Sequence, residues 1–295
     1  MQVIKNKYIF LGFSGFLTAI SIFSIAYFGL AQGIDFSGGT LWQIGGVSVE
    51  ELKSFAIEDL KIEDATFIPE SSTGSVILRM KEIPEELHQQ YFGKIKGKFS
   101  SAEDLRFESI GPAVGGELRS KAIWAFVLVL FGISTYIAFA FRKVSRPVAS
   151  WKYGLITLLT LFHDALIPAG LFAFLGYLVR VEVDTNFIVA ILVVMGFSVH
   201  DTIVVFDRIR ENLRLERNYK FDFNVLVNKS VNETFARSIN TSLTLVIVLI
   251  ALFVVGAASL KYFILTILVG TVIGTYSSIF VASPLLTIWR KDDRI

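Results

Sequence analysis

Two carboxylates stand in the middle of long apolar runs, where an acid needs an explanation. Asp164 lies in "TLLTLFHDALIPAG", and Asp201 lies in "GFSVHDTIVVFDRIREN". An ionisable side chain at the centre of a membrane-spanning helix costs about 2.5–3.5 kcal/mol on insertion scales, so such residues usually face the protein interior and have a function. The chemistry open to them is the binding and release of a proton, which removes the unfavourable charge.

Asp201 needs a partner from another helix. Ser198 and Thr202 share its helical face, whereas Arg208 would lie about 10 Å further along the helix, too far for direct pairing. The next apolar run is slightly short of a full crossing, which draws part of "RSINTS" into the bilayer and places Arg237 at its mouth. Arg237 then either pairs with Asp201 or extends to the membrane surface, as arginines at helix ends commonly do.

The surroundings of Asp164 allow two interpretations. Thr157 and Thr160 fall on its helical face, and His163 precedes it. Pro168 follows four residues later and cannot donate the amide hydrogen that the carbonyl of Asp164 would normally accept. This pattern is typical of a functional polar pocket, or of a simple proline kink whose free groups bond to neighbouring helices or water.

The same acids and their neighbours also raise the alternative of a metal site. His163, Asp164, His200 and Asp201 carry the nitrogen and oxygen ligands that an intramembrane metal-dependent hydrolase could use. No HExxH spacing accompanies them, and the chain has no cysteine, so we expect no metal, no cofactor and no enzymatic activity. His200 could carry a proton near neutral pH or only form a hydrogen bond.

Six apolar runs of about 20 residues must position these side chains. The composition, 53% hydrophobic and 18% charged, is far from the roughly 25% charge of an average soluble domain. A run of that length crosses a hydrocarbon core of about 30 Å as a helix, and the first run is longer than the roughly 7–15 residues of a cleavable signal segment. The predicted spans are Tyr8–Leu30, Ile123–Phe141, Tyr153–Leu178, Phe187–Phe206, Ile239–Leu260 and Tyr262–Trp289.

Basic residues orient these spans. Lysines and arginines precede the first span and follow the second, the fourth and the last, while the opposite short loops hold only Arg180 and Lys261. By the positive-inside rule both termini are cytoplasmic. The predicted parts are a first helix at 1–32, a periplasmic domain at 33–121, and five further helices at 122–295 with a cytoplasmic loop at about 207–236. The periplasmic part holds 15 of the 26 acids, which argues against a nucleic-acid surface.

The periplasmic part reads as strand, helix, two strands, helix and strand, an order that closes as a small ferredoxin-like sheet with two helices on one face. The strands are "TLWQI", "ATFIPE", "SVILRM" and "LRFESI", with a turn at "SSTG". The first helix has Ser48 as N-cap and Glu51 closing a capping box, and the second begins at Pro84. His88, alone on a polar helix, is predicted to be a solvated surface residue. We therefore expect an α-helical membrane protein with one small α+β domain.

Glycines mark three places where the chain turns or packs closely. In "GIDFSGGT", Gly38 and Gly39 suit a turn, because a strand follows them and not the helix of a phosphate-binding loop. Gly270 and Gly274 form a GxxxG pair that permits close helix approach, within this chain or to a partner. In "SIGPAVGGELRSKA" we predict a hinge between the periplasmic part and the membrane, made by Gly111, Pro112, Gly115 and Gly116.

Six stretches, in order and spread over nearly the whole chain, resemble the SecF family, the smaller membrane component of the bacterial SecDF protein-export complex. They are "GIDFSGGT", "SIGPAVGGEL", "FHDALI", "GFSVHDTIVVFDRIREN", "NETFARSINTSLT" and "GTVIGTYSSIFVASP". The resemblance implies an RND-type bundle of six helices in the bacterial inner membrane, with one periplasmic domain after the first helix. It places the family's proton-handling aspartate and a nearby arginine at Asp201 and Arg237. Many relatives have asparagine before that aspartate, where this chain has His200.

The resemblance also implies partners and a function. Acting with SecD beside the SecYEG channel, and with other Sec accessory membrane proteins, such a chain uses proton flow to move periplasmic domains that help to pull the preprotein outward. A small-molecule exporter of the wider RND group would share the bundle. A single chain of that kind commonly carries two six-helix halves and two outer domains, whereas this chain has one of each. No nucleic acid is expected as a partner.

Overall fold

The computed structural model describes residues 1–62, 64–70, 74–142, 148–216 and 221–289. The chain divides into two compact units. The membrane bundle consists of Met1–Ala31 and Trp124–Ile295, and the outer domain consists of Gln32–Ile123. Each unit has its own hydrophobic core, so each is described by itself.

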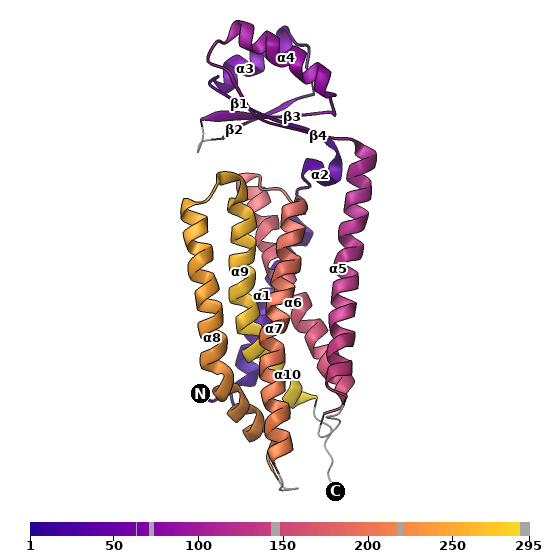
Figure 1. Cartoon of the computed structure of the whole chain (residues 1–295), viewed down its shortest axis with the longest axis vertical. Coiled ribbons are helices and arrows are strands. Elements are labelled where there is room, and N and C mark those ends of the chain that lie inside the picture. The colour runs from indigo at the N-terminus through magenta and orange to yellow at the C-terminus, as the bar shows by residue number, and fades with distance from the viewer. Residues whose placement is uncertain (63, 71–73, 143–147, 217–220, 290–295) are drawn as a thin grey trace. The chain divides into compact units, whose positions relative to one another are not determined.

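The outer domain is built on an antiparallel sheet of four described strands. The strands β1 (Gly39–Gly45), β2 (Thr66–Glu70), β3 (Ser75–Met80) and β4 (Glu103–Ile110) lie in the order β2-β3-β1-β4. The helices α3 (Val49–Glu58) and α4 (Glu85–Lys98) cover one face of the sheet, as Figure 1 shows. This is the predicted ferredoxin-like arrangement, and the class of fold is confirmed. Residues 71–73 of the predicted turn lie outside the described part of the chain.

Both helices of the outer domain begin where short sequence signals predict. The side chain of Ser48 accepts the amide of Glu51, and the Glu51 carboxylate faces the amide of Ser48, so the predicted capping box is present. Pro84 is the N-cap of α4, as predicted. Between the helices and the sheet lies an apolar core whose completely buried members include Trp42, Leu52 and Leu78.

The prediction for His88 is wrong, because this side chain belongs to that core. His88 is 2% exposed and stacks on Phe107 with ring centroids 3.7 Å apart. Its Nε2 lies 3.0 Å from Oδ2 of Asp104, and the other oxygen of this carboxylate, Oδ1, accepts the indole N–H of Trp42 at 2.9 Å. The helix turns His88 to the same side as Ile95, seven residues on, and that face packs on the sheet. The charged neighbours of His88 in the sequence occupy the other faces.

Six helices in the described part of the chain are long and apolar enough to cross a membrane, which confirms the predicted number. A short helix, α2 (Ile34–Ser37), precedes β1 in the outer domain, and a single 3₁₀ turn, η1 (Ala258–Leu260), precedes α9. After α9 the last span continues through a π-helical segment, η2 (Ser278–Ala282), into α10 (Ser283–Ile288). The spanning helices are α1 (Lys7–Phe28), α5 (Pro112–Ala140), α6 (Ser150–Val179), α7 (Thr185–Leu215), α8 (Phe223–Val255) and α9 (Lys261–Ser277).

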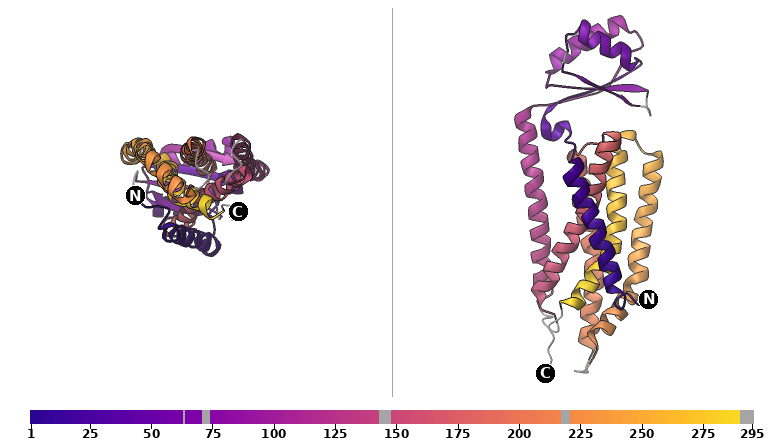
Figure 2. Two further views of the ribbon diagram at one scale, coloured as in Figure 1. Left: turned by 90° about the horizontal axis from the view of Figure 1, so that it is seen from below. Right: turned by 180° about the vertical axis from the view of Figure 1, so that it is seen from behind.

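Three of these helices are central and three are peripheral. Within their most apolar windows, 56% of α6, 50% of α7 and 61% of the last span are buried. The corresponding shares are 17% for α1, 11% for α5 and 17% for α8. Figures 1 and 2 show α6, α7 and α9 side by side, with α8 along the outside of α9 and α1 lying across α6. The central three therefore hold the protected interior of the bundle.

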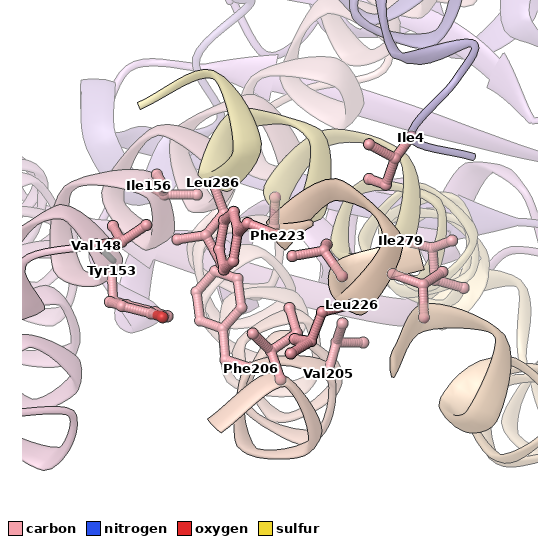
Figure 3. Packing of buried hydrophobic residues seen from close by; sticks show 14 of the residues in the cluster. Ile4, Val148, Tyr153, Ile156, Val205, Phe206, Phe223, Leu226, Ile279 and Leu286 are labelled. Carbon is pink, nitrogen blue, oxygen red and sulfur yellow. The ribbon is translucent and has the colours of Figure 1, made fainter. Parts of the chain in front are cut away.

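One end of the bundle is closed by an aromatic and aliphatic cluster (Figure 3). Tyr153 of α6, Phe206 of α7 and Phe223 of α8 are fully or almost fully buried in it. The N-terminal segment adds Ile4, whose amide donates to the side chain of Asn228 on α8 at 3.2 Å. This cluster joins the N-terminal segment, α5, α6, α7, α8, η2 and α10 below the polar middle of the bundle.

The glycines of the predicted hinge lie mostly inside a helix. Pro112 is the first residue of α5, so Gly115 and Gly116 fall in its first helical turns. A Cβ on Gly115 would stand 2.9 Å from the amide nitrogen of Gly38, so glycine is required there for close packing within the outer domain. The hinge itself stays a prediction.

Candidate functional site

The most enclosed acid of the bundle is Asp164 on α6, with 0% exposure. One of its oxygens lies 2.8 Å from Nδ1 of His163. The other oxygen accepts from the hydroxyl of Ser277 on α9 at 2.7 Å and from that of Ser198 on α7. Three helices therefore meet at one buried carboxylate, and the functional role of this polar pocket stays a prediction.

Close packing of α9 on α7 brings these hydroxyls into reach. A Cβ on Gly274 would lie 2.8 Å from Cβ of Ser198, and one on Gly270 would lie 2.3 Å from a methyl group of Val194. The predicted close approach at this GxxxG pair is therefore internal to the chain. Because Ser277 follows Gly274 by three residues, the same helix face that touches α7 carries Ser277 to Asp164.

The second carboxylate, Asp201, lies one turn along α7 from Ser198 and is 2% exposed. The hydroxyl of Ser242 on α8 donates to it at 3.4 Å. The same hydroxyl lies 2.5 Å from that of Thr275 on α9. No ion pair of Asp201 is found among the residues that the structure describes. In the described part of the chain, this acid is hydrogen-bonded by a hydroxyl group and not by lysine or arginine.

Helix α9 touches both carboxylates from opposite sides. Thr275 contacts the Ser242 hydroxyl beside Asp201, and Ser277 donates to Asp164. Two residues along a helix correspond to a rotation of about 200°, so the two side chains face different neighbours. Each hydroxyl can both donate and accept, so the chain Asp201–Ser242–Thr275 and the pair Ser277–Asp164 have the chemistry of a proton relay.

Both acids lie at the same depth in the bundle. Asp164 is 15 residues from the end of α6 at Val179, about 22 Å along the helix, and Asp201 is 16 residues from the start of α7 at Thr185, about 24 Å. These two ends are joined by a short connection. Measured from these ends, a hydrocarbon core of about 30 Å would include both carboxylates, in its half away from the connection between α6 and α7.

Several buried polar atoms around the acids have no partner among the described residues. Buried polar groups are ordinarily hydrogen-bonded to protein or to ordered water. Water molecules could therefore be accommodated here, next to both carboxylates. The atoms are Nε2 of His163 and the hydroxyl oxygens of Thr202, Ser238 and Thr271.

Arg237 is not brought to the acids, and His200, which directly precedes Asp201, is exposed. Arg237 is exposed on α8. Arg237 and Ser242 are five residues apart, which turns them about 140° from each other, and the bundle takes the Ser242 side. Thr157 and Thr160 also stay within α6, since their hydroxyls donate to carbonyls of that helix. Helix α6 runs through Pro168 without a break.

The residues that sequence reasoning missed are Ser242, Thr275 and Ser277. Each is a hydroxyl in an otherwise apolar span, in "NTSLT" or "GTYSS". Their spacing in the sequence does not predict which way each helix faces, so it could not show that these hydroxyls point toward the acids. Only the packed helices show this. The alternative metal ligands do not converge: among the described residues no group of three His, Asp or Glu side chains could hold one ion.

The bundle and its buried acids define a class, namely a membrane component of transport type that has one six-helix half and one outer α+β domain. Comparison with known proteins agrees with that class. The family described as "Protein export membrane protein SecD/SecF, C-terminal" matches residues 91–292. Protein translocase subunit SecF of Thermobaculum terrenum is 42% identical over 309 aligned residues, which cover 99% of this chain and 95% of that protein. The SecF subunit of Sebaldella termitidis is 36% identical and covers 99% of this chain and 92% of its own.

Solved structures give the same result. The crystal structure of SecDF from Thermus thermophilus, a translocon-associated membrane protein, matches with a TM-score of 0.83 and 31% identity. A structure of SecDF in a super-membrane-facing form matches with a TM-score of 0.69 and 32% identity. In both cases the match covers 98% of this chain and 38% of the SecDF chain. The chain belongs to the SecF family of protein translocase subunits and is a multi-pass membrane protein.

Proposed function

We propose that this chain acts with a SecD partner to convert proton movement through the membrane into work on a preprotein that leaves a SecYEG channel. The observation that carries the proposal is the environment of Asp201. A buried carboxylate whose described neighbours are hydroxyls has no fixed cation to neutralise it, and a proton can do so. Solved SecDF chains contain this fold as 38% of their length, which supports a larger SecD part as the partner.

Protonation of Asp201 would alter the contact between α7, α8 and α9. Protonation of the Asp201 oxygen that Ser242 contacts turns this oxygen into a donor, and the Ser242 hydroxyl can then donate to the carbonyl of Ser238, which lies 2.8 Å away. Two packings that differ by a few kcal/mol can then exchange populations. One charge moving through the membrane potential supplies about 2.3 kcal/mol per 100 mV, which is enough to bias such an exchange.

In the proposed mechanism, Arg237 acts from the outer face of α8. Asn240, Thr241 and Thr244 are exposed on the same side of this helix as Arg237. Polar side chains within a spanning helix are usually covered by protein and not by lipid. The SecD partner would cover this face and bring Arg237 into the proton path. Both termini and the loop after α7 would lie on the cytoplasmic side, as the basic residues indicate.

The test is the Asp201→Asn variant, which keeps the shape of the side chain and removes its titratable group. Export in inverted vesicles should lose its proton-dependent stimulation, while the amount of chain and its co-purification with SecD stay normal. Asp184→Asn is the matched control: it makes the same change on the same helix, and asparagine replaces aspartate well as an N-cap. Full stimulation that a protonophore still abolishes would show that Asp201 is structural. Purification without SecD and channel subunits would contradict the proposed assembly.

A further inference from the structure

Asp164 is a second fully buried carboxylate that the proton switch at Asp201 does not use. We propose that Asp164 is a proton-binding site of its own, and that proton uptake there releases Ser277 and so alters the packing of α9. The inference deepens the proposed function and rests on it only for its biological use. The proton binding itself follows from the contacts of Asp164.

Two serine hydroxyls contact the same oxygen of Asp164. The hydroxyls of Ser198 and Ser277 both donate to Oδ2 of Asp164, an arrangement in which this oxygen carries no hydrogen. When a proton binds Oδ2, that oxygen carries a hydrogen and becomes a donor and a weak acceptor. At least one of the two serine hydrogen bonds is then weakened or lost. Ser277 has a second acceptor within reach, because the Gly274 carbonyl lies 3.0 Å from its hydroxyl.

Among the described residues, no lysine or arginine pairs with Asp164. Its other oxygen faces Nδ1 of His163 at 2.8 Å, and Nε2 of that ring is buried without a described partner. The hydroxyl of Tyr276 on α9 is turned to α1, where it donates to the carbonyl of Phe10 at 3.1 Å. On α7 the nearest titratable groups are Asp201, one turn beyond Ser198, and the exposed His200.

The helix segment next to Ser277 departs from α-helical geometry. Ser278–Ala282 form a π-helix, and such segments occur frequently at functional sites. Here the Ser278 hydroxyl bonds the carbonyl of Thr275 at 3.0 Å, and the Ser283 hydroxyl bonds the carbonyl of Ser278 at 3.2 Å. A shift at Ser277 can therefore be taken up by a widened turn directly after it. Thr275, two residues before, carries the change to Ser242 beside Asp201.

Infrared difference spectroscopy of the whole chain in lipid, recorded between low and high pH, tests the proton binding directly. The wild type should show carbonyl bands of two buried protonated carboxyl groups. Asp164→Asn should remove one band, Asp201→Asn should remove the other, and Asp184→Asn should remove neither. If the spectrum of Asp164→Asn equals that of the wild type, Asp164 does not bind a proton and the proposal is overturned.

A milder variant keeps the test valid if Asp164→Asn fails to fold. Ser277→Ala removes one donor and fits the same space, so it should move both the frequency and the pH midpoint of the Asp164 band. Ser14→Ala, which removes a hydroxyl of α1 that bonds Tyr276, should leave that band unchanged. An unshifted Asp164 band in Ser277→Ala would contradict the release of Ser277.

The link to Asp201 has its own readout. In Asp201→Asn the midpoint of the Asp164 band should move by about one pH unit, the size at which neighbouring groups titrate as a coupled pair. An unmoved midpoint would overturn the coupling. Failure of the proposed function would appear elsewhere, as unchanged proton-dependent export in Asp201→Asn, and it would leave the spectroscopic result for Asp164 standing.

Discussion

The interiors of the outer domain and of the membrane bundle are built on opposite principles. The outer domain buries Trp42, Leu52 and Leu78 between a sheet and two helices, and its charged groups lie mostly on the surface. The middle of the bundle buries Asp164, Asp201 and a set of serines and threonines, while large apolar side chains of α1, α5 and α8 are exposed. Water drives the first arrangement through the hydrophobic effect, whereas in lipid close packing and hydrogen bonds must hold helices together.

This difference suggests that the outer domain serves as a stable scaffold, whereas the bundle can change its packing when a proton binds. The core of the outer domain is mainly apolar, with His88 and its contact to Asp104 as its titratable part, so apolar packing contributes most of its stability. In the bundle the bonds that join α6, α7, α8 and α9 end on titratable carboxylates, so the contacts that stabilise the interior are also the ones that a proton alters. Substitutions in the two interiors should therefore differ in kind as well as in size.

The largest effect on stability is expected from Trp42→Ala. Removing a completely buried tryptophan leaves a cavity and should destabilise the outer domain by about 3–5 kcal/mol. Pulse proteolysis of the whole chain in urea would measure this, with the helical signal of the bundle unchanged. Leu105→Ala, on an exposed strand position, is the control and should change stability by less than about 0.5 kcal/mol. Equal losses for both would mean that the core is not the source of stability.

The next effect lies in the bundle. Gly270→Ala places a methyl group 2.3 Å from a methyl group of Val194, a stiff β-branched side chain, and overpacking of this kind typically costs about 1–3 kcal/mol. Gly132→Ala, on α5, meets nothing within 4 Å and should be neutral or slightly stabilising. Unfolding in mixed micelles compares them. A Gly270→Ala protein as stable as Gly132→Ala would show that α7 and α9 do not pack closely here.

A smaller effect is expected where the outer domain has its own buried polar group. His88→Phe keeps the ring on Phe107 and loses the contact with Asp104, which should cost about 1 kcal/mol. A double-mutant cycle with Asp104→Asn should give a coupling of about 0.5 kcal/mol or more. Strict additivity would place His88 outside the polar contact and leave it as an apolar core residue.

The smallest effect should come from the exposed pair of Lys81 and Asp64. The hydrogen bond from the Lys81 ammonium holds the pKa of Asp64 below its usual range. A lowered folded-state pKa adds stability above the unfolded-state pKa, and this contribution is lost as pH falls through the folded-state value. Because both groups are fully solvated, screening makes the contribution small, and Asp64→Asn should shift neither the midpoint of unfolding nor its pH dependence beyond error. A clear shift would mean that surface charge matters more in this domain than its core suggests.

The sequence predicted the features that depend on local pattern. Apolar length gave six spans, alternation gave the four strands, and the Ser48 capping box gave the start of α3, because each of these signals is complete within a few residues. The rotation of one helix relative to its neighbour cannot be predicted from a short stretch of sequence. It decides that His88 faces the sheet, and that Ser242, and not Arg237, faces Asp201 in this structure. The sequence showed Gly270 and Gly274 as a close-packing motif, but it did not show that α7 is the helix that packs against them.

The exposed polar face of α8 bears on the lifetime of the chain in a cell. Arg237 lies 18 residues, about 27 Å, from the end of α8 at Val255, so it stands near the boundary of a hydrocarbon core of about 30 Å, with Asn240, Thr241 and Thr244 deeper on the same side. A solitary copy would hold these groups against lipid. We expect unassembled copies to be the form that membrane proteases recognise, so that the steady-state amount of this subunit follows the supply of its partner.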